Sequence, residues 1–171
     1  MNLICRILFL CFALLPQFVG AQERFTTRLT DKGILYFLEP KKLNDLSGVS
    51  RFEFDMTYVT GADSAYVNFS VKAPVAVKPS DIRLCYGTGL ILSCDDSRLL
   101  FIDRHGASYE IRMMCRFPIS ELRKALEEAS PPVFRFKMGN SEASASYRPS
   151  AWKKDRIRIN EMFNLIDIVK R

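Results

Sequence analysis

A strict alternation of apolar and polar side chains over residues 51–58 limits the fold of this chain more than any other feature. A period of two places successive side chains on opposite faces of an extended strand. The same pattern returns at 67–71 and 108–117. The sequence therefore predicts half-buried antiparallel strands, with inward residues Phe52, Phe54, Met56, Tyr58, Val67, Phe69, Val71, Tyr109, Ile111, Met113, Cys115 and Phe117.

Shorter segments of strand character lie on either side of these three. Residues 25–38 predict one or two strands broken at Asp31-Lys32-Gly33, and residues 39–50 predict a polar connection. Short strands separated by turn residues are typical of an antiparallel meander and not of βαβ units. The remaining strands are expected at 81–86, 90–94, 98–103 and 133–138, with a short edge at 143–148.

Two helices are predicted outside the sheet. The first begins near Ser120, whose hydroxyl can cap it, and ends before Pro131-Pro132. The second spans about 150–169 and has a broad apolar face at helical spacing. The expected fold is therefore α+β, a mainly antiparallel meander with two helices packed on one face, the second of them C-terminal.

The first 21 residues have the organisation of a cleavable secretory signal. Arg6 precedes a short apolar run at 7–15, and small residues end at Ala21. The run is shorter than the roughly 20 residues that a membrane span needs. We expect residues 1–21 to be removed and 22–171 to form a single domain in the periplasm or outside the cell. No transmembrane span is expected in the mature chain.

The positive charge of the chain is concentrated near its C-terminus. The formal net charge is +6, and most of the excess lies between Arg148 and Arg171, Arg148 included. In an exported protein this charge favours an envelope protein or an anionic surface as partner over nucleic acid. The predicted partner-binding residues are Trp152, Lys153, Lys154, Arg156 and Arg158.

Two observations connect these five residues with binding. The cations fall in the first half of the second helix, where the helix dipole disfavours positive charge. Tryptophan and arginine are also common at binding hot spots. In the alternative interpretation, Trp152 packs in the core and the cations form a solvated helix face.

Three cysteines remain after the signal, and an oxidising compartment would permit one disulfide. A two-residue Gly89-Leu90 turn would place Cys85 opposite Cys94. A four-residue loop at 103–106 would pair Ile102 with Ala107 and set Cys94 opposite Cys115 instead. The sequence leaves both pairings open, together with a third reading in which all three are buried thiols.

Catalytic chemistry has few candidates in this sequence. Glu53 and Asp55 lie on the same side of one predicted strand, about 7 Å apart, a separation resembling that of paired glycosidase carboxylates. Cross-strand ion pairs with Arg112 and Arg116 explain the same arrangement without catalysis. His105, the single histidine, lies in a predicted turn. The cysteine spacing lacks a Cys-x₂-Cys pair, so no metal site is expected, and no cofactor either.

The chain carries in order the segments Phe37-Leu38-Glu39-Pro40-Lys41-Lys42, Phe54-Asp55-Met56-Thr57-Tyr58-Val59-Thr60-Gly61, Val67-Asn68-Phe69-Ser70, Pro131-Pro132 and Trp152-Lys153-Lys154. This succession resembles small exported proteins of Bacteroides-type bacteria that have no assigned activity. The resemblance implies a bacterial envelope setting and no particular catalytic residue.

Three functions are consistent with these observations. The first is an exported, non-enzymatic domain for interaction or envelope assembly. The second is a periplasmic carrier of a small ligand or lipid, since an aromatic-rich interior could line an apolar cavity. The third is a hydrolase that uses the Glu53 and Asp55 carboxylates. An enzyme is the less expected outcome.

Overall fold

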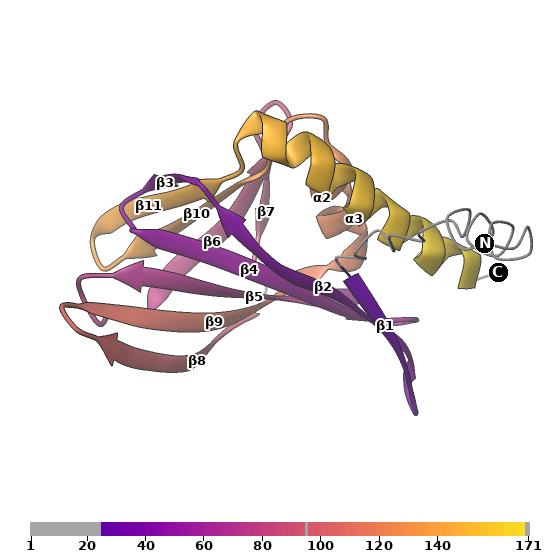
Figure 1. The fold of residues 1–171 in the computed structure, drawn as a ribbon, viewed down its shortest axis with the longest axis horizontal. Helices are drawn as coiled ribbons and strands as arrows, with labels where there is room; N and C mark the ends of the chain where they lie inside the picture. Colours follow the sequence, from indigo (N-terminus) through magenta and orange to yellow (C-terminus); the bar gives the residue numbers. More distant parts are fainter. Residues whose placement is uncertain (1–24, 95, 170–171) are drawn as a thin grey trace, which may run out of the picture.

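The computed structural model describes residues 25–94 and 96–169, which form two antiparallel sheets and two helices (Figure 1). The predicted signal at 1–21 lies outside the described residues. The large sheet has the order β1 (Phe25–Thr30), β2 (Gly33–Leu43), β4 (Arg51–Val59), β5 (Ser64–Ala73), β9 (Ser108–Pro118), β8 (Asp96–His105). The small sheet has the order β3 (Asp45–Ser47), β11 (Ser141–Ser146), β10 (Val133–Met138), β6 (Pro79–Tyr86), β7 (Leu90–Ser93).

The alternation at 51–58 has the predicted structural outcome. Phe52, Phe54, Met56 and Tyr58 are each at most 1% exposed, and they face the interior from β4. The class is α+β, mainly antiparallel sheet with a C-terminal second helix, as predicted. The sequence did not indicate that the strands divide into two sheets. The chain passes between these sheets after β2, β3, β5 and β7, and again through a helix after β9.

The prediction of a polar connection at 39–50 is wrong. β2 continues to Leu43 through an irregularity between Leu38 and Lys41, and β3 follows directly. The irregularity turns Lys41 toward the interior, where it is 4% exposed and its Nζ lies 3.5 Å from Oδ1 of Asp155. A buried lysine is tolerated here because it has a carboxylate partner.

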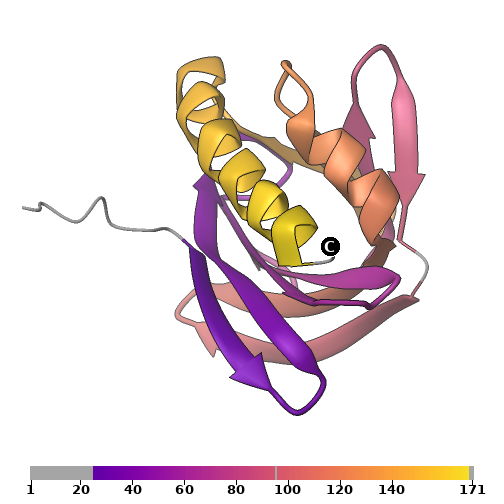
Figure 2. The same ribbon diagram turned by 90° about the vertical axis from the view of Figure 1, so that its right-hand side faces the viewer.

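The helices are α2 (Ile119–Glu127) and α3 (Pro149–Val169), which lie side by side over one side of the large sheet (Figure 2). Ser120 is inside α2 and does not cap it, because the helix begins one residue earlier. The Ile119 N–H instead donates to the Asp63 carbonyl at 2.9 Å, which ties the start of α2 to the β4–β5 turn. An Arg123–Asp167 ion pair of 2.8 Å joins the two helices.

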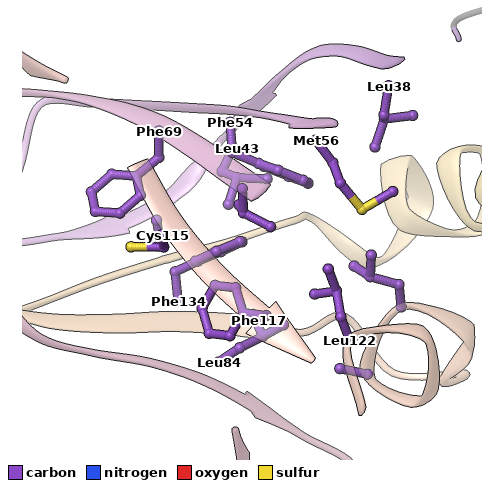
Figure 3. Packing of buried hydrophobic residues seen from close by; sticks show 14 of the residues in the cluster. Leu38, Leu43, Phe54, Met56, Phe69, Leu84, Cys115, Phe117, Leu122 and Phe134 are labelled. Atoms are coloured by element: carbon purple, nitrogen blue, oxygen red, sulfur yellow. The ribbon is translucent and has the colours of Figure 1, made fainter. Parts of the chain in front are cut away.

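Aromatic rings fill the space between the two sheets. The ring of Phe52 lies 5.2 Å from that of Phe69 in the large sheet and 5.0 Å from that of Phe134 in the small sheet. The ring centroid of Phe54 lies 5.1 Å from that of Phe134 and 6.2 Å from that of Tyr147. Figure 3 shows Phe69, Phe134 and Phe117 pointing into this shared interior. Such ring pairs stabilise the packing of the two sheets in addition to the stabilisation that comes from burying their apolar surface.

Candidate functional site

Trp152 does not lie on the surface. It is 1% exposed, its Nε1 donates to the Glu128 carbonyl at 3.0 Å, and its ring lies 5.0 Å from that of Tyr147. The prediction that Trp152 contacts a partner is therefore wrong, and its alternative, packing in the core, is what the structure has. The physical reason is spacing, since Trp152 belongs to the same buried helix face as Ile159 and Phe163.

The four predicted cations of α3 differ in their surroundings. Lys153 and Lys154 are exposed, whereas Arg156 and Arg158 are partly buried. Arg158 Nη1 lies 3.7 Å from Oδ1 of Asp155. Within the described part of the chain, Lys153 and Lys154 have no ion-pair partner. These two lysines are therefore the cations most available to an external anion.

Exposed aliphatic residues accompany these lysines on the solvent side of α3. Ile157 is 54% exposed, Leu165 42% and Ile168 67%. Lys153, Ile157 and Leu165 lie in one row along the helix at intervals of four residues, and Ile168 follows three residues later. The exposed carboxylate of Glu161 lies in the same row, between Ile157 and Leu165. We call Lys153, Lys154, Ile157, Leu165 and Ile168 the outer stripe of α3.

A buried ion pair lies behind the first turns of α3. Asp155 is 8% exposed and is reached by Lys41 from β2 and by Arg158 from its own helix. A surface hollow of about 380 Å³ opens beside it, lined by Ser150, Ala151, Lys154, Asp155 and Arg158. Lys41 was not predicted from the sequence. One signal could have found it: Asp155 falls on the apolar face of α3, where a carboxylate needs a buried cation.

The carboxylates Glu53 and Asp55 each bind an arginine. Asp55 is 2% exposed; it accepts hydrogen bonds from Arg112 Nη2 at 2.5 Å and Asn68 Nδ2 at 2.7 Å. Glu53 binds Arg51 at 2.8 Å. Arg112 therefore makes the cross-strand ion pair expected of it, while Arg116 lies opposite Tyr66 and Asp96. This geometry favours an ion-pair network on the outer face of the large sheet over a pair of catalytic groups.

The loop lengths that would pair Cys85 with Cys94 are not those of the structure. The loop that connects β6 to β7 is the three residues 87–89 and not the two residues 89–90, and Gly89 in this loop has a φ of 92°. Cys85 is consequently opposite Ile91, on the outside of the small sheet. The Cys94 N–H donates to the Ile82 carbonyl at 3.0 Å, so Cys94 shares the inward face of Ile82. The two cysteines therefore point to opposite sides.

Cys94 instead contacts Cys115. The predicted four-residue loop at 103–106 is wrong, because β8 runs to His105 and pairs it with Ser108. Cys115 is therefore opposite Ser97 and not Cys94. The thiols nevertheless meet, because Cys94 follows β7 on the inward face of the small sheet and Cys115 is an inward residue of β9 in the large sheet. The pKa of the Cys115 thiol is raised far above its usual range, first by the hydrogen bond with the Cys94 thiol and then by the burial of Cys115 itself.

The other features predicted from the sequence form no chemical site within residues 25–94 and 96–169. His105 is exposed in the β8–β9 hairpin, with Nε2 3.8 Å from Oε2 of Glu110. Among the described residues, no group of three His, Cys, Asp or Glu side chains could hold a metal ion. No helix in that part of the chain has the length and apolar character needed to cross a membrane. No protein-family model, curated protein or solved structure matches the chain.

Proposed function

We propose that the protein is an exported, non-enzymatic domain that associates with an anionic surface of the bacterial envelope through the outer stripe of α3. The observation that carries the proposal is the exposure of Lys153 and Lys154 together with Ile157 on one side of a helix whose other side is fixed in the core. Cations and aliphatic side chains on the same exposed helix face suit binding at the surface of a lipid bilayer.

The composition of the stripe favours a lipid surface over a protein. Protein interfaces are enriched in aromatic residues, Met and Arg, and are depleted of Lys. The only tryptophan, which would have suited a protein hot spot, is buried. The stripe offers aliphatic side chains and two lysines in its place, and the exposed Glu161 lies between its two ends. An acidic envelope protein remains the competing partner, and it predicts no affinity for lipid.

The test is sedimentation with vesicles of phosphatidylcholine containing about one third phosphatidylglycerol, using the protein without residues 1–21. Each lysine near an anionic membrane surface contributes about 1 kcal/mol to the free energy of binding. The variant K153E/K154E should therefore lose about 30-fold or more in affinity. Raising the salt from 0.05 to about 0.5 M should release the wild type, because screening shortens the range of the attraction.

A matched variant separates the stripe from net charge. R28E/K32E changes the charge by the same amount on the exposed β1–β2 hairpin and should bind like the wild type. Equal losses in the two variants would mean that binding follows total charge and not α3. Failure of the wild type to bind these vesicles at low salt would refute the proposal and favour an acidic protein partner.

The carrier and hydrolase alternatives receive less support from the structure. The rings of Phe52, Phe54, Phe69 and Phe134 contact one another directly, as side chains that fill a core do. The hollow beside Asp155 has a charged lining that does not suit an apolar ligand. Asp55 holds Arg112 and Asn68, which an activity based on that carboxylate would have to displace.

A further inference from the structure

The large sheet ends in an unusual edge strand. Among the described strands, four form sheet edges, and three are short: β3 has three residues, β7 four and β1 six. β8 has ten residues, and its centre is Leu99-Leu100-Phe101-Ile102. Leu99, Leu100 and Phe101 are 36%, 46% and 37% exposed. A long apolar edge strand presents unpaired backbone groups that another strand can bind.

The charges of β8 are complementary to those of a second β8 running the other way. Centring such a pair between Leu100 and Phe101 sets Arg98 opposite Asp103. It also sets Leu99 opposite Ile102 and Asp96 opposite His105. Among the described residues, neither Arg98 nor Asp103 has an ion-pair partner in its own chain. Opposite charges directly across an antiparallel pair are favourable.

The bulge in β8 makes this pairing geometrically consistent. In a regular strand, Arg98 and Asp103 would point to opposite faces, since they are an odd number of residues apart. The register with β9 shifts between Leu99 and Phe101, so the alternation moves by one residue at Leu100. Arg98 is then opposite Met114 and Asp103 opposite Glu110, both on the outer face of β9. The two charges consequently lie on the same face, as a direct cross-strand contact requires.

The same shift aligns the apolar centre. Leu99 lies opposite Met113 and Ile102 opposite Ile111, which are inward residues of β9. Leu99 of one copy would thus meet Ile102 of the other on the inner side. We propose that two copies of the protein pair through β8, antiparallel about a two-fold axis between Leu100 and Phe101, and join their large sheets into one. This inference does not depend on the proposed lipid surface.

The experiment is sedimentation equilibrium of the protein without residues 1–21, over a wide concentration range and with reductant present. The wild type should form dimers, and R98D should weaken them. An exposed charge pair changes an association constant about two- to threefold. The substitution replaces attraction by repulsion at two symmetric contacts, so the dissociation constant should rise about 30-fold. The exchange of both charges, R98D/D103R, should restore most of the wild-type affinity.

Two further variants complete the test. L100D places a charge at the centre of the edge and should give a monomer, while L29D does the same on the exposed β1 edge and should leave the dimer intact. Circular dichroism and thermal unfolding show whether each variant still folds. A wild type that is monomeric throughout, a dimer unaffected by R98D, or one that R98D/D103R fails to restore would overturn the proposal.

Discussion

Cys94 and Cys115 should form a disulfide when the protein meets an oxidising environment. Their thiols are already in contact, and the pair would link the end of β7 in the small sheet to β9 in the large one. Each thiol would lose one hydrogen atom to a disulfide oxidant such as oxidised glutathione, which is reduced to two glutathione thiols. Cys94 is the more exposed of the two and would attack first; Cys115 would then displace the bound glutathione.

The expected stabilisation follows from the length of chain that the bond closes. The segment between the two cysteines is about 20 residues long. Closing a loop of that size lowers the conformational entropy of the unfolded chain, which stabilises the folded state by about 3 kcal/mol. The native contact already exists, so little rearrangement should offset this gain. Oxidation should raise the urea concentration at the unfolding midpoint by about 1.5–2 M, if the free energy of unfolding falls by about 1.5–2 kcal/mol per M of urea.

The assay uses the protein without residues 1–21, which has three of the five cysteines, and compares samples incubated with oxidised or reduced glutathione. The mass of the unfolded, oxidised protein should fall by about 2 Da, and peptide mapping should place the link at Cys94 and Cys115. C85S should behave like the wild type, whereas C94S should show no stabilisation on oxidation. A link that includes Cys85, three alkylatable thiols after oxidation, or an unchanged midpoint would refute the reasoning.

Two other predictions concern buried polar groups. W152F should lower the free energy of unfolding by about 1–3 kcal/mol, because the Glu128 carbonyl loses its indole donor; chemical denaturation measures this, and a cost below 0.5 kcal/mol would contradict it. K41M should lower the free energy of unfolding by about 2–4 kcal/mol, because the buried Asp155 loses the Lys41 ammonium. The double variant K41M/D155L should regain most of that stability. If the double variant is as unstable as K41M, the carboxylate of Asp155 is not the cause of the stability lost in K41M.

The strands were predictable from the sequence where burial alone decides the pattern. Phe52 to Tyr58 alternate because one face of β4 meets the core and the other does not, and this signal is local. Lys41 was missed because its direction depends on an irregularity in β2 and on a carboxylate more than a hundred residues away in the chain. Such an arrangement leaves no periodic trace in the sequence near Lys41.

The candidate sites depended on the exact position of turns and the direction of single side chains, which the hydrophobic pattern of the sequence does not fix. The turn between β6 and β7 lies at 87–89 and not at 89–90, which shifts the register by three residues. The shift moves Cys85 from opposite Cys94 to opposite Ile91 and so changes which disulfide can form. Trp152 was placed with the neighbouring cations because it is adjacent to them in the sequence. Adjacent residues on a helix point in different directions, and the period of 3.6 places Trp152 with Ile159 instead.

The burial of Trp152 also provides the protein with an optical reporter. The chain has a single tryptophan, and that residue is enclosed where Tyr147 and the end of α2 meet α3. Its emission maximum should therefore report the docking of this one helix, separately from the unfolding of the sheets. A shift to longer wavelength on adding vesicles would mean that α3 detaches from the body of the protein, whereas an unchanged spectrum would mean that α3 binds as a rigid part of it.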